Sequence, residues 1–139
     1  IGSVQDDVEE QNMVLNDIGE NIEYFTEKAK ALVLLYPVPE LGIFPLEYYL
    51  YEYIDINEPI GYEMSYWDEY SYEINKYFDE YNKNNLYKVK TSKYFCDSYV
   101  KDKCVASFGK IMFYWDDDHL SYDGASIIGP EILEFIKKS

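Results

Sequence analysis

The chain has 139 residues, and its 27 acidic residues outnumber its 12 lysines, which gives a formal net charge of −15 at pH 7. This charge repels phosphate backbones and anionic lipid surfaces, so it argues against nucleic-acid and membrane-surface partners. Hydrophobic residues make up 47% of the chain, too large a share for a disordered acidic protein. The length suits one domain with its own core.

The first part of the chain predicts a lead-in, a helix and a strand. Residues 1–10 are expected to form a flexible acidic lead-in, and a helix is predicted from Gln11 to about Lys30. Its apolar residues recur at steps of three and four and form one stripe: Val14, Ile18, Ile22, Phe25 and Ala29. The apolar run "ALVLLY" (31–36) predicts a strand covered on both faces, and it is far too short to cross a bilayer. Pro37 and Pro39 end that strand, because proline cannot donate a ladder hydrogen bond.

The second part predicts two further helices and a second strand. Residues 40–65 read as a long loop with one short helical piece, and the aromatic side chains of 48–67 either contact a sugar or acyl ligand or fill the core. A helix is predicted over 67–81, followed by a strand at "LYKVK" (86–90). Ser121 is a plausible N-cap for a last helix that ends near Lys137, and Pro130 should kink or divide that helix.

The order of these elements favours an α/β fold. Helices alternate with the strands "ALVLLY" and "LYKVK", which predicts that these two strands lie parallel in one sheet with helices on its faces. The chain shows no internal repeats.

The single histidine, His119, follows three aspartates in "WDDDHLSYDGA". The Asp116 carboxylate could accept a hydrogen bond from one imidazole nitrogen, which would leave the other nitrogen free as a base. Three other readings stay open at this point. His119 could merely cap or pack at a helix start, the aspartates could form a solvated acidic turn, or "DDDH" could bind a metal through oxygen ligands and one nitrogen.

The two cysteines, Cys96 and Cys104, can form one disulfide or remain two free thiols. The loop between them, "DSYVKDK", is polar, which argues against deep burial of both thiols.

Three stretches taken in order resemble one family: "LVLLYPVPELG", "FCDSYVKDKC" and "MFYWDDDHLSYDGA". They are similar to the C-terminal part of the SGNH domain that is fused to membrane O-acyltransferases of the acyltransferase-three superfamily. The resemblance covers about residues 11–137. It implies a three-layer, flavodoxin-like parallel sheet with helices on both faces, of which residues 11–139 would form an incomplete, C-terminal part.

The resemblance also implies roles for particular residues. Asp116 and His119 match the family's D-x-x-H block and would be the acid and base of a catalytic triad. The positions that match the helix start behind this block are Leu120, Ser121, Gly124 and Ala125. Cys96 and Cys104 match the family's paired cysteines, which implies a disulfide and an oxidising compartment. No cofactor and no metal are expected.

The implied function is acyl-ester chemistry on glycans or similar acceptors, outside the cytoplasm, with a multi-pass membrane domain in the same protein. The family's serine stands in an early "GDS" block that this chain lacks, so the nucleophile is unknown. Ser3, in "IGS", lacks the aspartate, and Asn16-Asp17 lacks the glycine of the family's oxyanion-hole block and lies on a predicted helix. The chain alone is therefore expected to be inactive. The alternative is a non-catalytic module, derived from the same fold, that binds a glycan or a protein.

Overall fold

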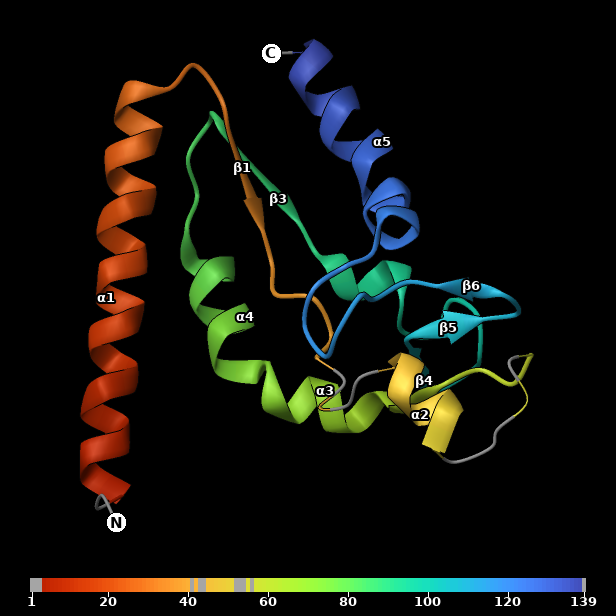
Figure 1. The fold of residues 1–139 in the computed structure, drawn as a ribbon. Coiled ribbons are helices and arrows are strands. Elements are labelled where there is room, and N and C mark those ends of the chain that lie inside the picture. The colour runs from red at the N-terminus through yellow and green to blue at the C-terminus, as the bar shows by residue number, and fades with distance from the viewer. Residues whose placement is uncertain (1–3, 41, 43–44, 52–54, 56, 139) are drawn as a thin grey trace.

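The computed structural model describes the whole chain except residues 1–3, 41, 43–44, 52–54, 56 and 139 (Figure 1). The helices are α1 (Val4–Lys28), α2 (Pro45–Tyr51), α3 (Met64–Tyr70), α4 (Tyr72–Glu80), the 3-10 helix η1 (Thr91–Tyr94) and α5 (Tyr122–Lys138). The strands are β1 (Leu32–Leu35), β2 (Gly61–Glu63), β3 (Leu86–Val89), β4 (Lys103–Val105), β5 (Ser107–Phe108) and β6 (Ile111–Met112). None of the described helices is long and apolar enough to span a membrane.

Strands β1 and β3 pair in parallel, with Leu32 opposite Leu86 and Leu35 opposite Val89, which confirms the predicted pairing. Helix α1 runs along one side of this pair and α5 rises on the other (Figure 1). Because side chains alternate along a strand, Leu34 packs in one cluster with residues of α1 and α4, whereas neighbouring side chains pack in a second cluster with residues of α5. The α/β class is therefore confirmed.

The parallel sheet is small, in keeping with the incomplete domain that the resemblance implied. Within the described residues the strands form three two-stranded sheets: β1 with β3, β2 with β4, and β5 with β6. The last two pairs are antiparallel. Strand β1 is also not covered on both faces along its whole length, because Leu35 is 46% exposed.

The main core lies below the β1–β3 pair in the view of Figure 1, where η1, β4–β6 and the start of α5 meet. The rings of Phe95 and Tyr114 lie 5.5 Å apart, and those of Phe95 and Phe113 lie 5.7 Å apart. A buried polar contact joins the α2 region to this core, since the hydroxyls of Tyr49 and Ser107 are 2.6 Å apart. Phe113 and Tyr114, which lead into the histidine loop, are thus anchored in this core.

The first helix differs from its prediction at both ends. It begins at Val4, so it includes most of the segment expected to be a flexible lead-in, and it ends at Lys28. Its apolar stripe is only partly covered, because Ile22 is buried whereas Val14 and Phe25 are about half exposed. The helix approaches α4 closely at Gly19. An added Cβ there would lie 2.3 Å or less from the hydroxyls of Tyr77, on α4, and Tyr81, just after it.

Three further features of the secondary structure differ from the sequence-based expectations. The helix predicted over 67–81 begins at Met64 and divides into α3 and α4 at Ser71. Residues 40–65, predicted as loop with one helical piece, contain α2 but also strand β2. Helix α5 runs undivided through Pro130. Gly129 precedes that proline and has no Cβ to clash with the proline ring, which favours continuation of the helix.

Candidate functional site

The loop between β6 and α5 carries the candidate site and is held by hydrogen bonds at each end. The backbone N–H of Trp115 donates to the carbonyl of His119 over 2.8 Å, and Tyr114 forms an isolated β-bridge with Leu120. The Asp116 carboxylate accepts hydrogen bonds from the backbone N–H groups of Asp118, at 3.2 Å, and of His119, at 2.7 Å. An aspartate that bonds its own downstream backbone favours a tight turn. The local sequence itself therefore folds Asp116 and His119 together.

The start of α5 fixes the other side of this loop. The hydroxyl of Ser121 accepts a hydrogen bond from the N–H of Gly124 over 3.1 Å, which confirms Ser121 as the N-cap. The same hydroxyl donates to the carbonyl of Met112 over 2.6 Å, and the Ser121 N–H donates to the carbonyl of Phe113 over 2.8 Å. These bonds tie the helix start to the end of β6.

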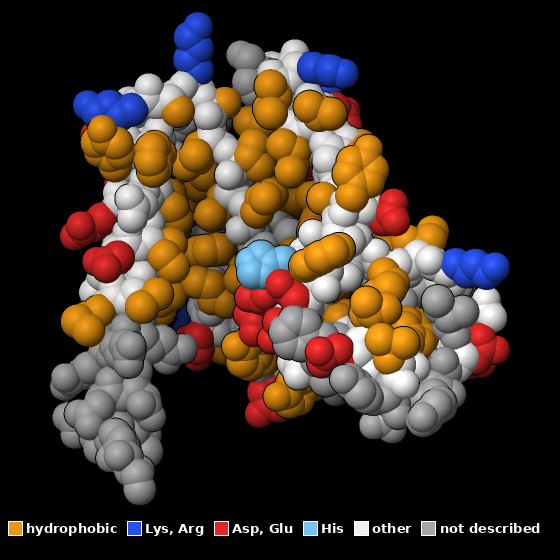
Figure 2. Space-filling model, in the orientation of Figure 1, with side chains coloured by type: hydrophobic (Ala, Val, Ile, Leu, Met, Phe, Trp, Pro, Cys, Tyr) orange, Lys and Arg blue, Asp and Glu red, His pale blue; other side chains and the backbone are white. Residues whose placement is uncertain are grey.

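The imidazole of His119 faces the carboxylate of Asp116. Its Nδ1 lies 3.0 Å from both Asp116 carboxylate oxygens, as the D-x-x-H spacing predicted. No hydrogen bond to Nε2 is found among the described residues, and the side chain is 74% exposed. Figure 2 shows the histidine at the surface, directly beside acidic side chains. One ring nitrogen is therefore held by the protein while the other faces outward.

The two side chains shift each other's pKa in opposite directions. The pKa of His119 is raised, chiefly by the hydrogen bond and charge of Asp116 and further by the charge of Asp118. Partial desolvation opposes the change at Asp116, but the backbone hydrogen bonds from His119 and Asp118, together with the imidazole itself, lower the pKa of its carboxyl. Both shifts favour an imidazolium–carboxylate pair.

Asp118 also approaches the imidazole, since one of its carboxylate oxygens lies 2.7 Å from Nδ1. Asp116, Asp118 and His119 thus present three potential ligand atoms within 4.8 Å of one another. Such a cluster could supply the oxygen and nitrogen ligands of the metal reading. Attraction between the carboxylates and the single imidazole explains the same arrangement without a metal. Exposed acidic groups are also common in proteins without a bound metal.

The structure supplies no partner nucleophile for this base within the residues that it describes. No serine hydroxyl forms a hydrogen bond with His119, and the nearest serine in sequence, Ser121, is engaged with the carbonyl of Met112. Ser3 lies outside the described residues. Asn16 and Asp17 lie within α1, as predicted, rather than in a loop that could form an oxyanion hole.

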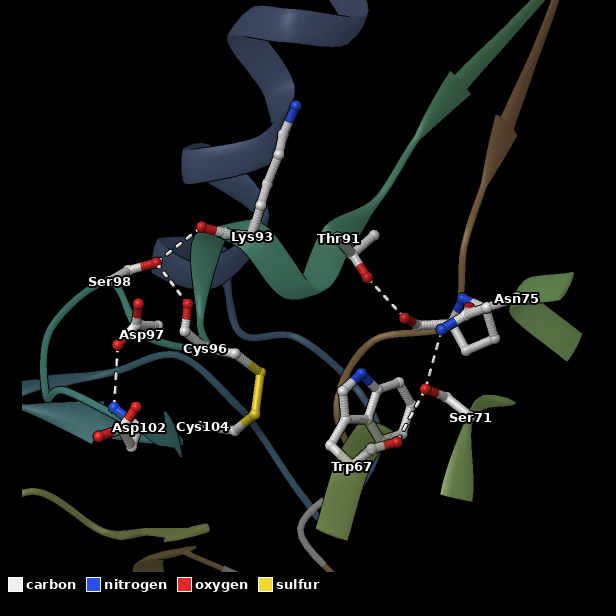
Figure 3. Close-up of a disulfide and its surroundings, with 11 residues drawn as sticks. Trp67, Ser71, Asn75, Thr91, Lys93, Cys96, Asp97, Ser98, Asp102 and Cys104 are labelled. Atoms are coloured by element: carbon white, nitrogen blue, oxygen red, sulfur yellow. Dashed lines mark hydrogen bonds between the residues drawn. A yellow bond between two sulfur atoms is a disulfide. The ribbon is translucent and has the colours of Figure 1, made fainter. Parts of the chain in front are cut away.

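Cys96 and Cys104 form a disulfide, as the family resemblance implied. Figure 3 shows the bridge next to the indole of Trp67, and the three residues form one buried cluster. The intervening loop turns at Asp97 and Asp102, which both have positive φ angles, of 55° and 59°. The bridge therefore joins the loop after η1 to β4 and packs against Trp67 of α3.

The aromatic side chains of 48–67 are partly buried in the core and partly exposed. Tyr49 and Trp67 are buried and belong to core clusters. Tyr66 is 66% exposed and lines a surface hollow with Glu40. Sequence reasoning did not find Glu40 as a functional candidate, although it stands at the end of the "PVPE" turn that follows β1.

Fold and site together define an α/β domain with a histidine–aspartate pair at the start of its last helix. A family model described as "SGNH domain (fused to AT3 domains)" matches residues 2–134. The chain belongs to this family, which confirms the resemblance drawn from its motifs. No curated protein and no solved structure matches the chain.

Proposed function

We propose that this chain is the extracytoplasmic SGNH domain of an acyltransferase-like membrane protein and acts on acyl esters of glycans or similar acceptors. The observation that carries the proposal is the arrangement of His119, whose Nδ1 is held 3.0 Å from the Asp116 carboxylate while the ring remains exposed. This is the arrangement of the base and its orienting acid in a Ser-His-Asp system. Membership of a family fused to membrane acyltransferase domains supports the membrane context.

In this mechanism Asp116 keeps the proton of His119 on Nδ1, so Nε2 is the basic nitrogen. Nε2 takes the proton from a serine hydroxyl as that oxygen attacks the acyl carbonyl, and the carboxylate stabilises the imidazolium that forms. The imidazolium then returns the proton to the leaving oxygen. The serine and the oxyanion donors would come from outside the described residues.

The disulfide supports the proposed location. A bridged pair such as Cys96 and Cys104 persists in oxidising compartments and is rare in the cytosol. The net charge of −15 also argues against contact with anionic lipid.

The alternative function is a non-catalytic module that binds a glycan or a protein partner. The observation that favours it is the lack of any serine hydroxyl bonded to His119 within the described part of the chain. A base without its nucleophile leaves little catalysis, because the three groups act as a unit.

The two functions are separated by acyl transfer assays on the full-length protein, including its membrane domain. His119→Ala should lower transfer by about three orders of magnitude or more, and Asp116→Asn by about two to four orders, since the imidazole loses its orienting group. Asp117→Asn is the matched control and should change transfer by less than about fivefold, because the described carboxylate contacts of the imidazole come from Asp116 and Asp118. Full transfer by His119→Ala would reject the catalytic proposal and favour the binding module. His119 is exposed, and asparagine at position 116 keeps the side-chain oxygen that accepts the backbone hydrogen bonds of the turn, so each variant should keep the fold of the parent.

A further inference from the structure

Two adjoining hollows open at the carboxyl end of β1, away from the His119 pair. One has a volume of about 280 Å³ and is lined by Glu40, Trp67, Tyr70 and Glu73, among others. The second, of about 240 Å³, shares the first three of these residues and adds Tyr66. The carboxyl ends of strands are where α/β sheets bind ligands. These hollows therefore occupy a favourable place for a ligand.

Aromatic side chains form most of the wall of the second hollow and part of the wall of the first. Tyr66 and Tyr70 stand one helical turn apart on α3, so they share a face of that helix, and they are 66% and 61% exposed. Trp67 is only 2% exposed and lies behind them, with its ring centroid 5.8 Å from that of Tyr70. Two tyrosine side chains are thus presented to solvent over a rigid, buried indole.

The charge of the hollows is negative. The Tyr70 hydroxyl donates a hydrogen bond to a Glu40 carboxylate oxygen over 3.1 Å, which places the carboxylate next to the tyrosine. Glu73 adds a second carboxylate, and no lysine lines either hollow among the described residues. The chain as a whole carries a net charge of −15. A phosphate, a sulfate or a sugar acid would be repelled from this place.

We propose that the hollow formed by Glu40, Tyr66 and Tyr70 binds an organic ammonium group. A cation is attracted to the faces of aromatic rings, and aromatic cages with a nearby carboxylate recognise ammonium ligands. The group could belong to an amino sugar with a free amine or to a quaternary head such as choline. Its two sources share this chemistry and are distinguished below.

The proposed subsite does not include the histidine loop, since no residue from Trp115 to His119 lines either hollow. Binding of a ligand there therefore does not depend on the chemistry of His119.

Nuclear magnetic resonance of the ¹⁵N-labelled chain tests this proposal directly. The probes are choline and its neutral isostere 3,3-dimethylbutan-1-ol, each added at matched sodium chloride concentration. The chain has two tryptophans, so its spectrum contains two indole N–H signals. Trp67 lies behind the hollow, and its indole N–H has no partner among the described residues. Trp115 is 78% exposed, lines neither hollow, and serves as an internal control.

Choline should shift the Trp67 indole signal and the amide signals of Tyr66 and Tyr70, with little change at Trp115. The neutral isostere should bind at least about fivefold more weakly, because it keeps the shape but loses the charge. Equal binding of the isostere would overturn the proposal, and so would the lack of any Trp67 shift at about 100 mM choline, a concentration that detects even very weak binding.

Substitutions then locate the ligand. Glu40→Gln and Tyr66→Leu should each weaken choline binding about two- to fivefold, as expected for exposed charge and cation–π contacts. Glu47→Gln on α2 and Tyr122→Leu on α5 are the matched controls and should bind as the parent does. Unchanged binding in both test variants would overturn the assignment.

Tighter binding of glucosamine than of choline identifies the amino sugar as the source of the ammonium group, and tighter binding of choline identifies the quaternary ammonium head. Binding that survives in His119→Ala, whatever its effect on acyl transfer, keeps this inference separate from the proposed function.

Discussion

Gly124→Ala should destabilise the domain although it replaces a helical glycine with the best helix former. Gly124 is buried near the start of α5 and its N–H bonds to the Ser121 cap. An added Cβ would lie 2.1 Å from the carbonyl oxygen of Phe113 and 3.0 Å from its carbonyl carbon. These are backbone atoms of the segment that leads into the histidine loop, so they cannot rotate away as the end of a side chain could.

The size of the effect follows from two opposing contributions. Alanine gains about 1 kcal/mol over glycine in a helix interior. Forcing a methyl group into closely packed backbone costs about 1–3 kcal/mol, and the short distance places Gly124 at the upper end of that range. The net loss in unfolding free energy should be about 2 kcal/mol, which corresponds to a fall in melting temperature of about 8 °C for a domain of this size.

Thermal and urea unfolding followed by circular dichroism measures this loss. Gly129→Ala, in the same helix, is the matched control, because an added Cβ there meets nothing within 4 Å beyond its chain neighbours. It should change stability by less than about 1 kcal/mol, since the helix propensity gained is offset by the restriction that Pro130 places on a preceding alanine. If Gly124→Ala were as stable as Gly129→Ala, the close contact between α5 and Phe113 would be wrong, and with it the anchoring of the loop.

Three other outcomes are expected. Removing the Cys96–Cys104 bridge should lower the unfolding free energy by about 2–3 kcal/mol through loop entropy; equal urea midpoints with and without reductant would contradict the bridge. The pKa of His119 is raised by the carboxylates, so the pair stabilises the fold fully below the unfolded pKa of about 6.5, and this contribution is lost as the pH rises through the folded pKa. Asp116→Asn should lower the imidazole midpoint in an NMR titration, and an unmoved midpoint would mean that the two groups do not interact. The chain alone should hydrolyse aryl esters no faster than its His119→Ala variant; a clear loss of activity would reveal an overlooked serine, with Ser3 the first to examine.

Much of the local structure could be predicted from the sequence because it depends on neighbouring residues. The run "ALVLLY" predicted β1, and Ser121 predicted the start of α5, since caps and apolar runs act over a few positions. The Asp116–His119 contact was predictable for the same reason, because a turn spanning three residues brings the two side chains together. The family could also be recognised from three short stretches in the right order.

The remaining features depend on contacts between distant segments. Strand β2 has no strong strand signal of its own and forms because Glu63 and Gly61 pair with Lys103 and Val105 on β4. The exposure of Leu35 reflects how little of β1 the neighbouring helices cover, which no periodicity in the strand reveals.

The same division applies to the two candidate sites. The sequence by itself determined that a carboxylate three positions before His119 would reach the imidazole, because the intervening turn is local. It did not determine that Asp118 would also approach Nδ1, since that depends on the path that the loop takes between its anchors at β6 and α5. The pairing of Glu40 with Tyr70 was decided only by the tertiary structure, because it requires the turn after β1 and the end of α3 to meet across 30 residues of chain. Contacts within a turn are set by neighbouring backbone, whereas contacts between elements are set by how the whole core packs.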